Sequence, residues 1–219
     1  KLKFGEFIII AIATIGGAQF INVIFQVILI LIKSLLNIEI DNRVTEIIQN
    51  SNPILSAIFV AILGPIVEEL MFRGTLLKKV RPYGDKTAVI YTAIAFGLFH
   101  CNIEQIPYTI AVGLVLGYSF VRTNNIIYPI ILHIMLNSIS VILSTLLKYN
   151  LTIPMVIVEF LIIILIILAL IFIPIKLTSG KVKISNESKY DKKNLYKNIG
   201  YISTVIIVIA VTVLEAIIQ

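Results

Sequence analysis

The chain of 219 residues is 58% hydrophobic, has a mean hydropathy of +1.02 and carries a formal net charge of +6. Soluble domains are roughly 45–50% apolar, so this composition excludes a soluble globular protein. A single cysteine excludes an intrachain disulfide framework. The basic residues lie in predicted loops, so we expect acidic lipid headgroups, and not nucleic acid, as their partner. The sequence therefore predicts an all-α polytopic membrane protein that forms one domain over residues 1–219.

Seven apolar segments that are long enough for membrane helices follow one another along the chain. The first is too long for the apolar region of a signal peptide, so we expect no cleavable signal peptide. Proline opens the second, fourth and sixth segments, which is typical of the first turn of a helix. The predicted spans cover residues 7–36, 53–80, 87–103, 107–122, 126–147, 154–175 and 199–217.

The distribution of basic residues between the predicted loops indicates an orientation. With the N-terminus in the cytoplasm, fourteen Lys and Arg fall on the cytoplasmic side, three fall outside, and Arg73 stays within the membrane. This asymmetry follows the positive-inside rule, and one missed helix would scramble it. We therefore expect an integral plasma-membrane protein with a cytoplasmic N-terminus. The richness in Ile, Lys and Asn indicates a prokaryotic source.

The second predicted span carries three charged side chains, Glu68, Glu69 and Arg73, within six residues. Each ionised group at the bilayer centre costs about 2.5–3.5 kcal/mol on insertion scales, so their presence needs a reason. On a helix, Glu69 and Arg73 are at i and i+4 and can pair, whereas the i+4 neighbour of Glu68 is the uncharged Phe72. The pattern predicts that Glu69 and Arg73 brace the fold and that Glu68 is available as a base.

Both histidines of the chain also fall in predicted spans. His100 lies on the third, while His133 and Asn137 are four residues apart on the fifth and share a helical face. A lone intramembrane histidine is often only a hydrogen-bond partner between helices. Here polar side chains from three spans are predicted to converge, which favours a functional site. Its members are Glu68, Glu69, Arg73, His100, His133 and Asn137.

The residue types limit the chemistry of such a site. The three aspartates fall in loops or at helix ends, which excludes an intramembrane aspartyl pair, and neither Gly-x-Ser-Gly nor His-Glu-x-x-His occurs. A carboxylate with imidazoles suits the activation of a water molecule. Glu68, His100 and His133 are also the side chains that a zinc site with one open position would use. We expect no obligatory cofactor, with zinc as the metal that the site would otherwise take.

Three motifs occur in order on successive predicted spans, and together they are specific although each alone is weak. They are Glu68-Glu69 with Arg73, Phe96 with His100, and His133 with Asn137. The ordered set resembles the CPBP (ABI) family, which includes the type II CAAX prenyl endopeptidases and bacteriocin-processing membrane proteases. It covers about residues 53–140, and the spans outside that core carry no motif. The resemblance implies an all-helical intramembrane endopeptidase, a family often labelled metalloprotease.

The same resemblance implies a role for each motif. Glu68 and His100 would hold and activate the water molecule. His133 and Asn137 would stabilise the oxyanion of the tetrahedral intermediate, and the neighbouring Glu–Arg pair would fix the geometry. The substrate would be a membrane-associated protein or peptide, either prenylated or a secreted precursor such as a bacteriocin leader.

Two other classes of protein stay open on the sequence alone. The same fold could serve as a non-proteolytic immunity or scaffold protein that binds a peptide or a membrane partner. A scaffold, however, has no need for both histidines and both glutamates. A proton-coupled transporter also uses membrane Glu and His, but transporters usually contain internal repeats, and this sequence shows none. We therefore expect an endopeptidase, with the scaffold as the alternative.

Overall fold

The computed structural model describes residues 3–37, 50–178, 184–185, 187–191 and 195 of the chain. Within these residues every regular element is helical and no strand occurs, as the composition predicted. The helices that are long and apolar enough to cross a membrane are Phe4–Leu36, Pro53–Tyr83, Ile106–Thr123, Ile127–Lys148 and Thr152–Ile175. The chain is therefore a polytopic helical membrane protein.

The predicted number of seven spans is not confirmed. Five predicted spans correspond to the long helices, and the seventh, residues 199–217, lies outside the described residues. The third span is shorter than predicted, because helix α6 (Asp85–Phe99) has only 15 residues, or about 22 Å, against a hydrocarbon core of about 30 Å. The chain turns away after α6, where Cys101 adopts a positive φ of 46° and the Asn102 side chain accepts from the Glu104 N–H.

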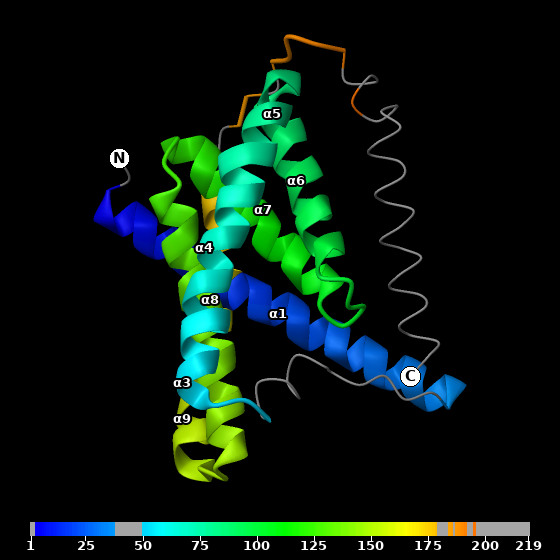
Figure 1. The fold of residues 1–219 in the computed structure, drawn as a ribbon, viewed down its shortest axis with the longest axis vertical. Helices are drawn as coiled ribbons and strands as arrows, with labels where there is room; N and C mark the ends of the chain where they lie inside the picture. The colour runs from blue at the N-terminus through cyan, green and yellow to red at the C-terminus, as the bar shows by residue number, and fades with distance from the viewer. Residues whose placement is uncertain (1–2, 38–49, 179–183, 186, 192–194, 196–219) are drawn as a thin grey trace.

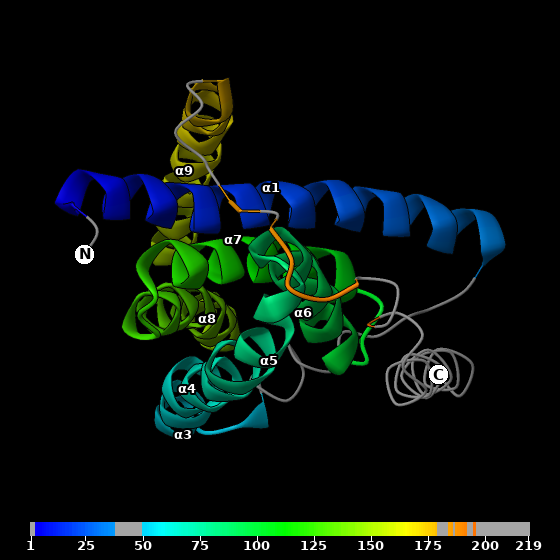
Figure 2. The ribbon, with the colours of Figure 1, turned by 90° about the horizontal axis from the view of Figure 1, so that it is seen from above.

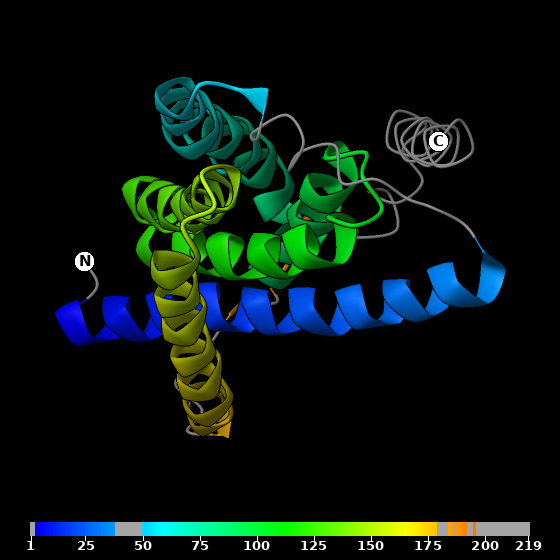
Figure 3. The same ribbon diagram turned by 90° about the horizontal axis from the view of Figure 1, so that it is seen from below.

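Helix α1 (Phe4–Leu36) crosses the other helices and extends beyond them at its C-terminal end (Figures 1, 2 and 3). It packs on α7 (Ile106–Thr123) and α9 (Thr152–Thr178). Helices α6 and α7 lie so close that a Cβ atom on Gly113 would be 2.8 Å from the Cα atom of Ala93. Helix α8 (Ile127–Lys148) contacts both α7 and the second predicted span, so it lies between these two parts of the bundle.

The second predicted span is one continuous helical rod from Pro53 to Tyr83. Its segments are α3 (Pro53–Ser56), η1 (Ala57–Leu63), α4 (Gly64–Glu69), η2 (Leu70–Leu77), α5 (Lys78–Val80) and η3 (Arg81–Tyr83).

Two parts of this rod, η1 and η2, are π-helical, with the wider turns that often mark functional sites. At the end of η1, the Gly64 N–H bonds to the Phe59 carbonyl five residues earlier. This register suits Pro65, which has no N–H and whose ring clashes with the carbonyl four residues earlier in an α-helix. Helix α4, which carries both glutamates, is therefore held between two widened segments.

The helix ends and loops fall into two groups by their contacts, and the two groups lie on opposite sides of the bundle. Four contacts join residues that the charge distribution assigned to the same side: Glu6 with Arg122, Pro82 with Lys189, Lys33 with Glu104, and Ser51 with Lys148. The first two belong to one side and the last two to the other. These contacts thus agree with the predicted alternation of successive loops between the two sides of the membrane. Which side faces the cytoplasm stays a prediction.

Candidate active site

Arg73 and Glu69 lie in the middle of the rod and are fully buried. The Arg73 NH1 nitrogen donates to Glu69 Oε1 at 2.6 Å, so the pair predicted from i, i+4 spacing is present. The NH2 nitrogen donates to the Gly113 carbonyl on α7 at 3.2 Å. The guanidinium also lies over the ring of Phe96 on α6, 4.7 Å from its centroid. Arg73 therefore connects the rod to α6 and α7.

Glu69 also bonds to α8, a contact that sequence spacing did not predict. The Nδ1 atom of His133 lies 2.9 Å from Glu69 Oε1, the same oxygen that accepts from Arg73. An ionised carboxylate only accepts hydrogen bonds, so Nδ1 carries the ring proton. The second nitrogen of the His133 ring, Nε2, lies 3.7 Å from Glu68 Oε2.

Glu68 and Glu69 each have one carboxylate oxygen without a hydrogen-bond partner among the described residues, and of the two only Glu68 lines the cavity described below. The side chain of Glu68 is 24% exposed, yet Oε2 is shielded from solvent and has no hydrogen-bond partner among the described residues. The 3.7 Å to His133 Nε2 is too long for a direct hydrogen bond. A water molecule at about 2.8 Å from both atoms fits beside the line that joins them. Glu68 is therefore placed to bond a small molecule in the site.

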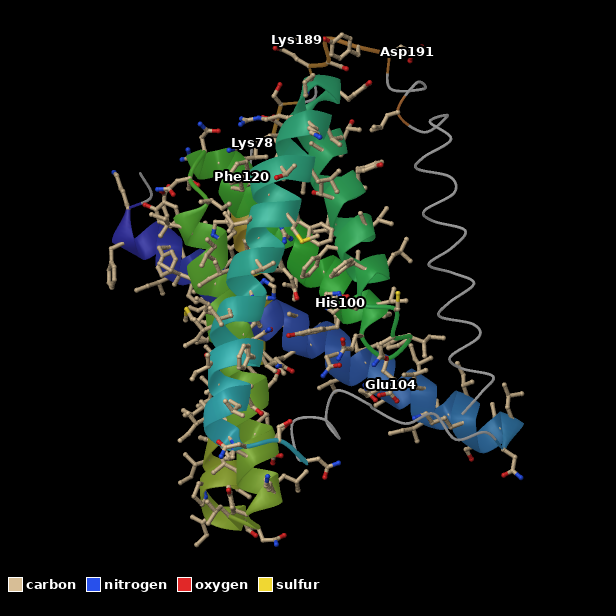
Figure 4. All side chains as sticks on the ribbon, viewed as in Figure 1. Lys78, His100, Glu104, Phe120, Lys189 and Asp191 are labelled. Atoms are coloured by element: carbon tan, nitrogen blue, oxygen red, sulfur yellow. The ribbon has the colours of Figure 1, made fainter. Side chains whose placement is uncertain are left out.

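His100 follows the last residue of α6, at the end of that helix nearer Glu104 and α1 (Figure 4). Its Nδ1 atom lies 2.8 Å from the Phe96 carbonyl, one turn earlier. A carbonyl oxygen only accepts, so Nδ1 is the protonated nitrogen and Nε2 carries the lone pair in the neutral ring. The ring packs edge-on against Phe96, with centroids 4.9 Å apart.

Asn137 lies one turn after His133 on α8. Its Nδ2 atom donates to the Val60 carbonyl in η1 at 2.9 Å, which ties α8 to the π-helical part of the rod. One hydrogen of Nδ2 and the Oδ1 oxygen stay available for a ligand. The amide is therefore held in place by the protein and still able to donate.

A cavity of about 550 Å³ brings these side chains together. Four of the six predicted site residues line it, namely Glu68, His100, His133 and Asn137. The buried pair of Glu69 and Arg73 lies behind them, where it contacts His133 and Phe96.

Sequence reasoning missed the part of this cavity that α1 supplies. Gln19, Asn22 and Gln26 line the cavity, as does Glu104, which is buried and pairs with Lys33 at 2.8 Å. The signal was available in the sequence, because the three carboxamides stand at i, i+3 and i+7 in a span that is otherwise mostly apolar.

The side chains around the cavity include residue types that can bind a metal ion. The described part of the chain contains no group of three His, Cys, Asp or Glu side chains arranged to bind one metal ion. Both histidines do carry, at Nδ1, the kind of hydrogen bond that orients a metal-binding histidine. The same hydrogen bonds serve a histidine that binds water.

Residues 50–139 match the family model described as type II CAAX prenyl endopeptidase Rce1-like. Two curated bacterial proteins are similar to a part of the chain of about the same length. The putative membrane peptidase YdiL of Bacillus subtilis (strain 168) is 31% identical over 94 residues, which are 41% of this chain and 37% of that protein. The membrane-embedded CAAX protease MroQ of Staphylococcus aureus (strain USA300) is 30% identical over 95 residues, which are 40% of this chain and 38% of that protein.

The chain thus spans less than two fifths of the length of these curated relatives. No solved structure matches it significantly. The matched residues carry all three motifs, whereas α1 and α9 lie outside them. Residues 50–139 are therefore similar to the type II CAAX prenyl endopeptidases, the family that the motifs predicted.

Proposed function

We propose that the chain is an intramembrane endopeptidase that cleaves a membrane-associated or precursor peptide with a water molecule activated by Glu68. The observation that carries the proposal is the meeting of Glu68, His100, His133 and Asn137 around one cavity within a membrane bundle. The names of the two relatives, a peptidase and a protease, support the same class.

Glu68 and His100 supply the acceptors for the attacking water. The lone pair on His100 Nε2 and the unpartnered Oε2 of Glu68 each accept one hydrogen of the water molecule. Its oxygen attacks the carbonyl carbon of the scissile peptide bond while Glu68 takes the proton. When the tetrahedral intermediate breaks the C–N bond, Glu68 returns that proton to the leaving amine. Each step uses side chains of this chain and water.

His133 and Asn137 stabilise the negative charge that develops on the carbonyl oxygen. Asn137 donates from the hydrogen of Nδ2 that is not bonded to Val60. His133 donates from Nε2 in its doubly protonated form, with Glu69 as the counter-ion at Nδ1, 2.9 Å away. Glu69 thus acts through His133, and Arg73 holds Glu69 in place.

The test compares Glu68→Gln with the parent protein after both are purified and mixed with the peptides and small proteins of the same cell's membranes. New peptide termini are counted by mass spectrometry. We expect the parent to generate them and Glu68→Gln to lose at least about 100-fold in rate, because the amide accepts no proton. Glu159→Gln, an exposed position on α9, is the matched control and retains the parent rate.

Two outcomes contradict the proposal in different ways. Parent-like turnover by Glu68→Gln would indicate that Glu69, and not Glu68, acts as the base. Complete absence of new termini with the parent protein would support the alternative, a non-proteolytic immunity or scaffold protein.

A further inference from the structure

Helix α1 lays a row of carboxamides along the cavity that the catalytic proposal does not use. Gln19, Asn22 and Gln26 share one face of α1 and line the cavity. Adjacent positions of the helix carry apolar side chains that face outward, such as Val23 and Val27, each 52% exposed. Among the described residues, none of the three carboxamides has a hydrogen-bond partner. Polar side chains in a membrane helix cost free energy unless they have partners, so this row indicates a ligand-binding surface.

Helix α8 supplies the same cavity with a second polar row. His133, Asn137, Ser140 and Ser144 follow one another on α8 at helical spacing and all line the cavity. From the first to the last of them the helix rises about 16 Å. Helix α1 crosses α8 (Figures 1 and 2), so the two polar rows border one cavity but do not run side by side.

The length of the α8 row suits an extended peptide. A chain in β conformation advances about 3.3 Å per residue, so about 16 Å holds roughly five residues. Along the axis of α1, Asn22 lies about 4.5 Å from Gln19 and about 6 Å from Gln26. The second interval is close to the repeat of about 6.6 Å at which an extended main chain presents its polar groups to one side, and the first is about 2 Å shorter.

The chemistry of the α1 row distinguishes a peptide from a lipid chain. A carboxamide both donates and accepts, so it can pair with either the N–H or the C=O of a peptide main chain. A prenyl chain in the same place forms no hydrogen bond, and the polar groups that it desolvates stay unpaired, which costs affinity.

We propose that Gln19, Asn22 and Gln26 bind the main chain of an extended, unprenylated peptide beside the scissile bond. This inference rests on the proposed function and assigns the substrate class of the same cavity. Helix α1 lies outside residues 50–139, so the row belongs to a part of the chain that the family match does not include.

The experiment measures binding apart from cleavage, using the full chain with the Glu68→Gln substitution. Equal amounts of two random octapeptide pools, one with a free central cysteine and one S-farnesylated, are passed over the immobilised protein. Retained peptides are quantified by mass spectrometry. The test variant adds Gln19→Met, Asn22→Leu and Gln26→Met. The control adds Ser34→Ala, an exposed position of α1 outside the cavity.

We expect the unmodified pool to be retained and the triple variant to retain at least about tenfold less of it, because three hydrogen bonds are lost. The Ser34→Ala control retains the parent amount. Equal retention by the triple variant, preference for the farnesylated pool, or retention of neither pool would each overturn the inference. Thermal unfolding shows whether the triple variant folds, and Asn22→Leu alone replaces it if it does not.

The two proposals fail separately. If the protein without the Glu68 substitution cleaves the unmodified pool and the α1 substitutions leave KM unchanged, hydrolysis stands and the carboxamide row does not. If no cleavage occurs but retention depends on the carboxamides, the row stands and the endopeptidase proposal fails.

Discussion

His133 Nδ1 lies 2.9 Å from Glu69 Oε1, so the orientation of a cavity histidine on α8 depends on a buried carboxylate of the neighbouring rod. The same oxygen accepts from Arg73 at 2.6 Å. The ion pair that braces the rod and the hydrogen bond that fixes the histidine are therefore parts of one network. Substitutions of Arg73 should therefore change both the stability of the fold and the catalytic activity.

Arg73→Met should lower the melting temperature in detergent. It removes the only strong partner charge of Glu69 on the rod and leaves a carboxylate that is fully buried, a change worth about 3–5 kcal/mol. The double variant Glu69→Gln/Arg73→Met removes both charges and should regain much of the lost stability while activity stays low. A melting temperature of Arg73→Met equal to that of the parent would rule out the brace.

Gly113→Ala should separate α6 from α7. The added Cβ would lie 2.8 Å from the Cα atom of Ala93, and backbone has no room to move aside cheaply. The same residue's carbonyl accepts from Arg73 NH2, so the shift also disturbs the buried pair. We expect a loss of about 1–3 kcal/mol in unfolding free energy. Gly5→Ala, where the new Cβ meets nothing within 4 Å, is the matched control and should melt like the parent.

Asn137→Ala should reduce kcat about 100- to 1000-fold with little change in KM, because its amide is proposed to bond the oxyanion only as charge develops. Ser138→Ala, at the next position and outside the cavity, is the control. Steady-state kinetics on a peptide cleaved by the parent give both constants. Unchanged kcat in a folded Asn137→Ala protein would remove this residue from the oxyanion site.

The role of metal is decided by chelation. We expect the purified protein to keep its peptidase activity after a strong chelator and to contain well under one metal ion per chain by elemental analysis. The expectation follows from the proposed use of Glu68 and His100 as water acceptors. Loss of all activity on chelation, with recovery on addition of zinc alone, would assign Glu68, His100 and His133 to a zinc site instead.

Labelling of single cysteines in a Cys101→Ser background tests the orientation. Lys189 donates its N–H to the Pro82 carbonyl, and Figure 4 places it at the α5 end of the bundle, whereas Leu151 follows α8 at the other end. With the N-terminus in the cytoplasm, Leu151→Cys should react with an impermeant maleimide on intact cells. Lys189→Cys should react only after permeabilisation. The reverse pattern would invert the topology.

Contacts within one element could be predicted from the sequence, and contacts between elements could not. The Glu69–Arg73 pair follows from i, i+4 spacing alone. The bond of Glu69 to His133 depends on how α8 packs against the rod, which spacing does not specify. The length of α6 was overestimated because Cys101 and Ile103 are still apolar, whereas the local turn at Cys101 ends the helix.

The α1 carboxamides escaped sequence reasoning for a related reason. Three uncharged polar residues lower the hydropathy of a 33-residue helix very little, so the segment still read as an ordinary span. Charged groups give the stronger sequence signal, because their cost in the membrane is largest. The spacing of Gln19, Asn22 and Gln26 becomes meaningful only when the cavity on that face is known.

Part of the cavity lining therefore belongs to a helix outside the residues that the family model matches. In the proposed function, chemistry and recognition belong to separate stretches of sequence, so the first can be retained while the second diverges. Chimeras that exchange residues 3–37 between two such proteins should then transfer the choice of peptide without rebuilding the catalytic residues. In the same way, a lineage could acquire new substrates by altering a single membrane helix.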